Sequence, residues 1–398
     1  TATTSYPCCV PTLGDFEGAG RVGLARRKYN AFSILNKELK ALNLCSVTTS
    51  FTMTKPTFSA LLWVILLVSC GQKSAVKPVT SLVLTPVQKM YAQGDTLNFS
   101  WKNPSAVAFD SVTFSLSGTS IAHTDDYLVL NASVLGEQSI EWVGYQQDKE
   151  VAQGALKVKI LANKAPKLYT YEIIASYPHD MEAYTQGLEF SNGILYESTG
   201  LLGFSSLRKV DYKTGVVLKQ HNLPEDVFGE GLTIYGDQLY QLTWQSGFGY
   251  IYDLEFNEIG RFAYGKSKEG WGLAHNEKQL FKSDGTDRIW ILQPTDGSEI
   301  AQFSTVTHQG FFNRANELEY VDGKIYANVY QKESMMIIDA NSGAIEGIVD
   351  FSGLKQKVTQ HPALDVLNGV AYHPEHQSFF VTGKKWDRLF EVRIVPKS

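Results

Sequence analysis

The amino-acid sequence predicts an all-β fold, and three observations support this prediction. Short alternations of apolar and polar residues follow one another along the chain, and clusters of turn residues separate them. One such pattern occurs five times in the second half of the chain. From Leu188 through Leu232, Leu273 and Leu318 to Val370, the copies follow one another at steps of 44, 41, 45 and 52 residues. Four strands per copy at this period are typical of a β-propeller, so the sequence predicts five blades.

Each copy of the pattern predicts its strands in a fixed order. The first two strands form a hairpin, as in residues 187–190 and 193–196, where two apolar alternations flank a polar turn. A third strand with its turn comes next, as in residues 209–215 and 336–343. The fourth strands are predicted at residues 216–219, 259–262, 300–303 and 345–348.

The two ends of this region predict how the ring closes. The last copy stops after its third strand, residues 389–394, without a fourth. A strand of suitable composition, residues 169–174, precedes the first copy. Pairing these two strands would leave no long open edge. The alternative is an open β-sandwich whose similarity to a repeat is accidental.

The sequence before residue 79 predicts a leader and a tether. Met53 precedes one lysine and an apolar run up to Ser69, an order typical of a secretory signal and shorter than the roughly 20 residues that span a membrane. Residues 67–70, Leu-Val-Ser-Cys, resemble the lipobox of bacterial lipoproteins. This resemblance implies that residues 53–69 form a lipoprotein signal peptide and that Cys70 becomes lipidated. An uncleaved anchor helix is the alternative.

These features predict a protein that is lipid-anchored to a membrane in the bacterial cell envelope. No acidic run follows Cys70, which favours the periplasmic face of the outer membrane. Residues 70–78 are predicted to be a tether. Residues 1–52 contain no methionine and no sustained periodicity, so we expect an upstream-translated segment without a fold of its own.

A second β region is predicted at residues 79–162, before the propeller domain at residues 168–398. Its strands are expected at residues 81–85, 96–101, 112–116, 127–130, 139–143 and 155–160. Six or seven short strands in a segment of this size suggest a small immunoglobulin-like β-sandwich. The cysteine pair of antibody domains is missing, so only the architecture is predicted.

Composition excludes several classes of function. The net charge is −5 and no basic stripe is visible, so no nucleic-acid partner is expected. The chain has four cysteines, none of them after Cys70, which excludes a disulfide or a thiolate metal site in the folded part. No serine-hydrolase elbow, zinc-protease motif, phosphate-binding loop or dinucleotide fingerprint is present. We expect a monomer.

Chemistry is predicted at the residue just before each repeated Gly-Leu or its equivalent. These five residues are Gln186, Glu230, Trp271, Asn316 and Asn368. In a propeller they would face one another around the axial channel. Amides donate and accept hydrogen bonds, and the single carboxylate is the only member able to move protons at neutral pH. Glu230 is therefore the candidate catalytic residue, although an amide ring bridged by channel water is the alternative.

A second column of candidates lies at the ends of the second strands. It consists of Gly200, Trp244, Gly285, Tyr330 and Lys384. Together with Trp271, the aromatic members would form an apolar wall around a small polar group. Lone tryptophans are more often core residues, but these aromatics occupy repeat-equivalent positions where other repeats carry glycine or lysine.

Several motifs in the five repeats resemble the glutamine cyclotransferase family of plants and bacteria. The most specific are Tyr-Thr-Gln-Gly-Leu at 184–188, Phe-Gly-Glu-Gly-Leu at 228–232, Glu-Gly-Trp-Gly-Leu at 269–273 and Val-Thr-Gly-Lys at 381–384. The resemblance covers residues 170 to 394 and leaves out the sandwich and the leader. It implies a five-bladed propeller and an acyltransferase of the aminoacyl type, which converts an N-terminal glutamine to pyroglutamate with release of ammonia.

The same resemblance implies roles for single residues. Glu230 would be the catalytic acid and base, and the residues lining the pocket would be Gln186, Trp244, Trp271, Asn316 and Lys384. Tyr330 departs from the family pattern, which usually has tryptophan there, so we expect altered affinity with activity kept. Lys385 also replaces a usual apolar residue. The expected partners are peptides or proteins with N-terminal glutamine.

Two rival functions stay open from the sequence. A channel lined by amides and aromatics would also suit a non-catalytic, ligand-binding propeller lipoprotein. A hydrolase of the lactonase kind would need a metal cage of Glu, Asn and Asp. The cyclisation requires no cofactor and no metal, although no motif rules out a structural divalent ion in the channel.

Overall fold

The computed structural model describes residues 80–102 and 107–397, and these consist almost entirely of strands and turns. Within these ranges the short 3-10 helix η1 (Lys355–Lys357) is the only helix, so the all-β prediction is confirmed there. No helix of these ranges is long and apolar enough to cross a membrane. The predicted segment 1–52, signal peptide 53–69, lipidation site Cys70 and tether 70–78 lie outside the described residues.

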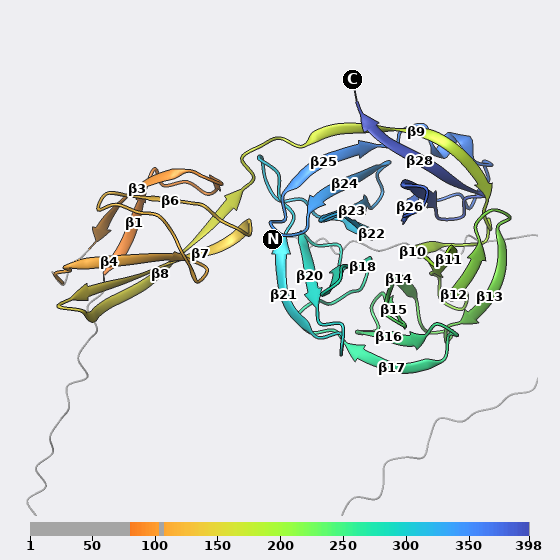
Figure 1. Cartoon of the computed structure of the whole chain (residues 1–398), viewed down its shortest axis with the longest axis horizontal. Helices are drawn as coiled ribbons and strands as arrows, with labels where there is room; N and C mark the ends of the chain where they lie inside the picture. The colour runs from red at the N-terminus through yellow and green to blue at the C-terminus, as the bar shows by residue number, and fades with distance from the viewer. Residues whose placement is uncertain (1–79, 103–106, 398) are drawn as a thin grey trace, which may run out of the picture. The chain divides into compact units, whose positions relative to one another are not determined.

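The first described region, up to residue 161, contains two sheets (Figure 1). One has the strand order β1–β3–β6 and the other β2–β8–β7–β4–β5. The strands are β1 (Ser81–Thr85), β2 (Tyr91–Ala92), β3 (Thr96–Lys102), β4 (Ser111–Leu116), β5 (Thr119–Ser120), β6 (Tyr127–Val129), β7 (Gly136–Gln146) and β8 (Lys149–Leu161). Apolar side chains of both sheets, among them Leu97, Leu128 and Trp142, form one buried core.

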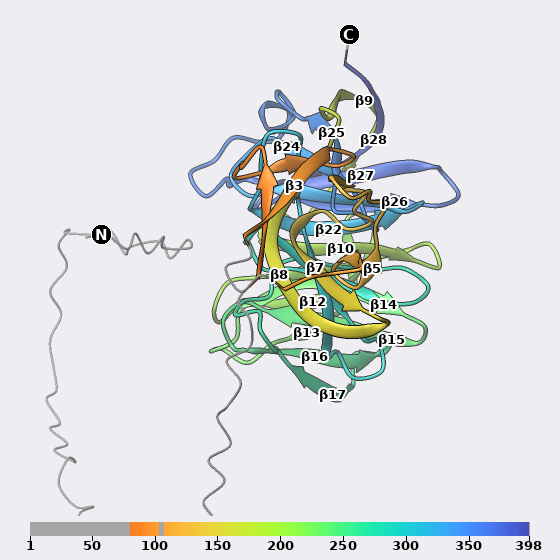
Figure 2. The same ribbon diagram turned by 90° about the vertical axis from the view of Figure 1, so that its left-hand side faces the viewer.

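All six strands expected in this region are present, but two of them are longer than predicted. β7 and β8 form one long hairpin, in which β8 is a long curved strand (Figure 2). Its turn residues Gln147 and Asp148 have φ angles of 49° and 60°. A two-residue turn of this kind usually has Asn-Gly or Asp-Gly, so the Gln-Asp pair gave no turn signal from which to place the strand ends.

The second region consists of five four-strand groups, three of which form separate antiparallel sheets. The first repeat has β10 (Thr185–Ser191), β11 (Ile194–Thr199), β12 (Ser206–Asp211) and β13 (Val216–Asn222). The second has β14 (Gly229–Tyr235), β15 (Gln238–Thr243), β16 (Phe248–Asp253) and β17 (Glu258–Ala263). The third has β18 (Leu273–His275), β19 (Leu280–Ser283), β20 (Arg288–Leu292) and β21 (Glu299–Ser304). Within each of these three repeats, every strand pairs with the next one along the chain, as the hairpin pattern predicts.

The fourth and fifth repeats are joined into one eight-stranded sheet by β9 (Lys167–Pro178). The fourth repeat has β22 (Ala315–Val321), β23 (Lys324–Val329), β24 (Ser334–Asp339) and β25 (Ile345–Asp350), and the fifth has β26 (Leu367–His373), β27 (Ser378–Gly383) and β28 (Arg388–Pro396). From Tyr169 to Pro178, β9 pairs antiparallel with β28, with Tyr171 opposite Ile394, and its first residues pair parallel with residues 347–349 of β25. The predicted pairing of residues 169–174 beside 389–394 is confirmed.

The inner strands of the five repeats surround a common centre, and the fourth strands lie at the periphery (Figure 1). Each inner strand contacts the next in the cycle β10, β14, β18, β22 and β26, and β26 contacts β10 again. Separate apolar clusters fill the spaces between neighbouring repeats. The starts of all five inner strands are therefore brought to one place.

Candidate active site

Bulges at the starts of the inner strands position the predicted ring residues. Gln186 lies between the paired residues Thr185 and Gly187 of β10, where the register with β11 shifts by one residue. The same shift occurs at Glu230, at Asn316 and at Asn368. A bulge leaves one residue out of the ladder and turns its side chain to a new direction. In these four repeats the ring residue is therefore released from the ladder, whereas Trp271 of the third repeat precedes β18.

The glycines after the ring residues let neighbouring repeats come close together. A Cβ atom on Gly272 would lie 1.9 Å from the backbone oxygen of Asn316. One on Gly187 would lie 2.6 Å from the backbone nitrogen of Leu232. No side chain fits at such distances, so the repeated glycine is required by the packing of adjacent inner strands.

Three of the predicted ring residues contact one another in a chain of hydrogen bonds. The Asn368 Nδ2 atom donates to Gln186 Oε1 at 3.2 Å and to the Thr185 carbonyl at 2.9 Å. The Gln186 Nε2 atom donates to Glu230 Oε1 in a long hydrogen bond of 3.5 Å. The exposed fractions of Asn368, Gln186 and Glu230 are 0%, 2% and 6%, so these side chains form a buried polar cluster.

Burial controls the charge of Glu230. Desolvation raises the pKa of the Glu230 carboxyl well above its ordinary value, because the charged form loses its water. The Lys384 ammonium group lowers this pKa, and the negative charge of Glu269 raises it. Lys384 is itself 4% exposed, with its Nζ atom 4.7 Å from the Tyr184 ring centre and 5.6 Å from that of Tyr330. The predicted carboxylate and lysine are thus electrostatic partners.

The aromatic residues predicted to form a wall each contact another ring. The rings of Trp271 and Tyr330 meet edge to face with centres 5.3 Å apart. Trp244 meets Phe228 in the same way at 5.7 Å. Gly285 leaves room for the Trp271 indole, since a Cβ there would lie 2.5 Å from it. Tyr330 therefore presents an aromatic surface against Trp271.

Glu269 connects the two tryptophans and was not singled out from the sequence. Its Oε2 atom accepts the indole N–H of Trp244 at 2.8 Å and that of Trp271 at 2.9 Å. Its Oε1 atom accepts the Gln245 side chain at 2.8 Å. Its sequence signal was its place as the first residue of the Glu-Gly-Trp-Gly-Leu motif at 269–273, which gave it no role, and its contact with Trp244 depends on the fold.

Asn316 occupies the equivalent bulge of the fourth repeat. It is 3% exposed. Its backbone carbonyl accepts the Ser283 hydroxyl at 2.7 Å, which ties it to the third repeat. This contact is made by the main chain of Asn316 and does not involve its side-chain amide.

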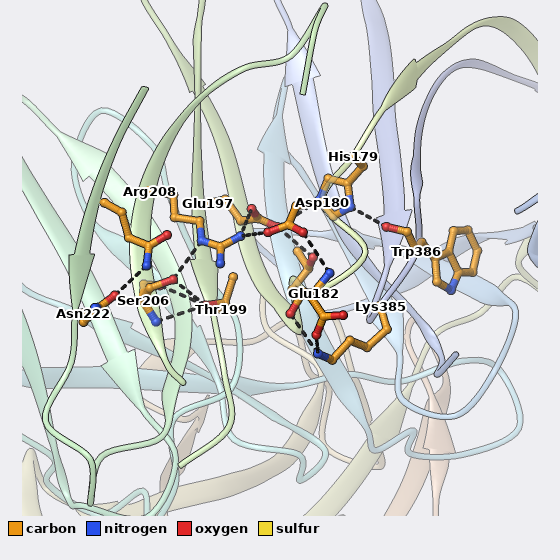
Figure 3. A network of polar contacts seen from close by, with 12 residues as sticks. His179, Asp180, Glu182, Glu197, Thr199, Ser206, Arg208, Asn222, Lys385 and Trp386 are labelled. Carbon is orange, nitrogen blue, oxygen red and sulfur yellow. Dashed lines mark hydrogen bonds and ion pairs between the residues drawn. The ribbon is translucent and has the colours of Figure 1, made fainter. Parts of the chain in front are cut away.

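A buried charged network lies beside the ring, between the first repeat and the end of the fifth (Figure 3). Glu197 Oε1 lies 3.0 Å from His179 Nε2 and accepts the Thr185 hydroxyl at 2.8 Å. His179 Nδ1 lies 2.8 Å from the Trp386 carbonyl. Arg208 donates to Asp180 at 2.8 Å. This network holds Thr185, the residue before Gln186, and Trp386, two residues after Lys384.

Comparisons with known proteins agree with the resemblance found in the motifs. A family model described as glutamine cyclotransferase matches residues 147–394. A glutaminyl-peptide cyclotransferase of Arabidopsis thaliana is 39% identical over 228 residues, which cover 56% of this chain and 71% of that protein. The crystal structure of Myxococcus xanthus glutaminyl cyclase matches with a TM-score of 0.55 and 33% identity, over 58% of this chain and 100% of that one.

Proposed function

Since the chain belongs to the glutamine cyclotransferase family, we propose that it converts the N-terminal glutamine of peptides and proteins to pyroglutamate, with Glu230 as general acid and base. One observation carries the assignment of the residue. Glu230 is a buried carboxyl whose pKa is raised, and it lies within hydrogen-bond reach of the Gln186 amide at the centre of the repeats. A carboxyl with a raised pKa can both take and return a proton near neutral pH.

The reaction requires two proton transfers in opposite directions. The α-ammonium group of the substrate loses a proton to the Glu230 carboxylate, and the free amine attacks the side-chain carbonyl carbon. The new carbon–nitrogen bond closes the five-membered lactam. As the old carbon–nitrogen bond breaks, the Glu230 carboxylic acid returns its proton to the departing amide nitrogen, which leaves as ammonia. The lactam nitrogen gives up its remaining extra proton to the released ammonia, so the products are the neutral pyroglutamyl peptide and ammonium. One group with both protonation states accessible is sufficient for this sequence.

The other residues of the ring have binding roles in this proposal. Because the attack is intramolecular, the protein mainly has to hold the glutamine side chain in a curled conformation, which can contribute several kcal/mol. The half-buried rings of Trp244, Trp271 and Tyr330 would cover its methylene groups. The amides of Gln186, Asn316 and Asn368 would bind its polar atoms, and a donor such as Asn316 would stabilise the developing oxyanion.

We also propose a specific architecture for each of the two β regions. The cycle of inner-strand contacts supports a five-bladed propeller at residues 168–398, with β9 completing the last blade. The two sheets of residues 80–161 support an immunoglobulin-like sandwich. From the sequence we also propose that Cys70 is lipidated, that this lipid anchors the protein to the periplasmic face of the outer membrane, and that the protein is a monomer.

The proposed chemistry uses no metal or other cofactor. In residues 80–102 and 107–397, no group of three or more His, Cys, Asp or Glu side chains is arranged to hold a metal ion. All the steps are carried by Glu230 and the binding residues around it. We therefore expect a chelator to leave the rate largely unchanged, even where a structural ion occupies the channel.

The decisive experiment measures ammonia release from a Gln-initiated peptide, together with the mass loss of the peptide. Glu230→Gln should keep the fold and lower turnover by roughly 10² to 10⁴, the usual contribution of a positioned acid and base. Asp226→Asn, on an exposed carboxylate of the preceding loop, is the matched control and should keep the native rate. Near-native cyclisation by Glu230→Gln would refute the carboxylate assignment, and binding without cyclisation by the native protein would favour the ligand-binding propeller.

A further inference from the structure

The connection between β11 and β12 exposes two large apolar side chains beside the site. Leu202 is 57% exposed and Phe204 is 79% exposed, whereas Gly200 and Ser205 at the two ends of the connection are buried. Clustered exposed apolar residues mark surfaces that bind something, while scattered ones need no explanation. These two lie within one six-residue connection.

Both ends of this connection are attached to the site. A Cβ on Gly200 would lie 2.3 Å from the Phe228 phenyl ring and 3.0 Å from Gln186 Nε2, so Gly200 packs against both side chains. At the other end, the Ser205 hydroxyl accepts the backbone N–H of Gly229 at 3.0 Å. Gly229 directly precedes Glu230. The exposed pair therefore lies next to the site, outside the residues that surround Glu230, and is not on a distant surface loop.

The connection is also held in one shape. Leu201 has φ of 90° and Gly203 has φ of 79°, so the chain turns sharply twice. The Phe204 N–H donates to the Leu201 carbonyl at 3.0 Å, and the Ser205 hydroxyl donates to the same carbonyl at 2.8 Å. A left-handed conformation at leucine is strained and persists only where the surroundings fix it. A fixed turn with exposed apolar side chains can bind a partner without first losing conformational freedom.

We propose that Leu202 and Phe204 bind apolar side chains at the third and fourth positions of the substrate peptide. This inference rests on the proposed function, which puts the N-terminal glutamine at the ring. The Cα atoms of Leu202 and Phe204 lie at most about 7 Å and about 14 Å from that of Gly200, since a residue spans at most about 3.6 Å. An extended peptide advances about 3.3 Å per residue, so its third and fourth residues lie about 7 Å and about 10 Å from the first, within these limits.

The corresponding connection of the second repeat shows that the apolar pair is not a general feature of the repeats. Residues 244–247 are Trp-Gln-Ser-Gly, and the exposed members Gln245 and Ser246 are polar. A bound peptide would thus meet exposed apolar side chains at the first repeat and exposed polar side chains at the second.

The test compares two tetrapeptide amides, Gln-Gly-Gly-Gly and Gln-Gly-Leu-Phe, with the dipeptide amide Gln-Gly as reference. We expect the native protein to favour Gln-Gly-Leu-Phe by roughly 5- to 20-fold, mainly through KM, because two side chains become partly buried. The double variant Leu202→Ser/Phe204→Ser should lose this preference and keep the native rate on Gln-Gly amide. The matched control is Val216→Ser/Leu218→Ser on β13 of the same repeat, since both residues are 55% exposed.

Each outcome separates this inference from the proposed function. Failure to cyclise even Gln-Gly amide refutes the proposed function itself. Normal cyclisation of Gln-Gly amide without any preference between the tetrapeptides, or a preference that survives in Leu202→Ser/Phe204→Ser, refutes the apolar contact alone. A loss of self-association or of binding to phosphatidylglycerol vesicles in that variant, with the peptide preference unchanged, would assign the pair to a second copy or to a membrane and also overturn the inference.

Discussion

Removal of the Glu269 carboxylate should affect both peptide binding and proton transfer by Glu230. Glu269 accepts both indole N–H groups of the aromatic wall and raises the pKa of Glu230. A hydrogen bond to a charged group contributes about 1.5 to 3 kcal/mol, and the partial exposure of Glu269 places each of its bonds at or below the low end of this range. Glu269→Ala should therefore cost about 2 to 3 kcal/mol, or roughly 30- to 150-fold in kcat/KM, most of it in KM.

The variant Glu269→Gln separates the two effects. Its amide oxygen still accepts from an indole N–H, but the negative charge near Glu230 is gone. Since that charge raises the pKa of Glu230, its removal lowers this pKa. The value of kcat/KM rises with pH as Glu230 of the free enzyme ionises to the carboxylate, which acts as the base. In Glu269→Gln this rising limb should therefore move to lower pH.

The assay is the pH dependence of ammonia release for the native protein, Glu269→Gln, Glu269→Ala and the control Gln245→Ala. Gln245→Ala removes only the third hydrogen bond of Glu269 and should leave the pH profile in place. An unshifted rising limb in Glu269→Gln would contradict the electrostatic part of the reasoning. A native KM in Glu269→Ala would contradict the positioning part.

Four further predictions follow from the structure and the sequence. Trp244→Ala and Trp271→Ala should each weaken peptide binding by about 1 to 3 kcal/mol, measured as KM or as inhibitor affinity, whereas equal losses in kcat alone would argue against a binding wall. A variant beginning at residue 180 lacks β9 and exposes the edges of β28 and β25, so it should melt at lower temperature or aggregate, and unchanged melting would speak against closure by β9. Cys70→Ala should move the protein from the membrane fraction to the soluble fraction, and native fractionation would disprove the lipid anchor. The His179–Glu197 pair should add most to stability between the ordinary pKa values of the two groups, 4.5 for Glu and 6.5 for His, because the pKa of His179 is raised and that of Glu197 is lowered. This contribution is lost as the pH rises through the pKa of folded His179 or falls through that of folded Glu197, and a Glu197→Gln variant with unchanged melting within this window would exclude the role.

Local sequence patterns were sufficient for most of the strands. Alternation and turn residues are short-range signals, and they placed the hairpins of all five repeats and the closing strand at residues 169–174. Where a turn lacks its usual residues, as at Gln147 and Asp148, the strand ends were misjudged. The full length of β9 was also missed, because pairing with both β28 and β25 extends it to Lys167–Pro178.

The candidate site was predictable only as far as it repeats. Repeat-equivalent positions identified Gln186, Glu230 and Asn368, which the fold connects by hydrogen bonds. Glu269 and the network of His179 and Glu197 have no equivalent in the other repeats, so spacing gave no sign of them. Their roles depend on contacts between residues that are distant in the sequence, such as His179 with Trp386.

The bulges explain how a regular repeat can carry an irregular site. A residue inside a ladder must pack against both neighbours, and its identity is constrained by the alternation of the strand. The bulged residue is exempt from this constraint, because it is left out of the pairing. The repeats can thus keep the same backbone at this position while it carries glutamine, glutamate or asparagine. A single carboxylate among amides then becomes buried without an ionic partner in its own strand, which is the condition that raises the pKa of Glu230 and suits it to move a proton in both directions.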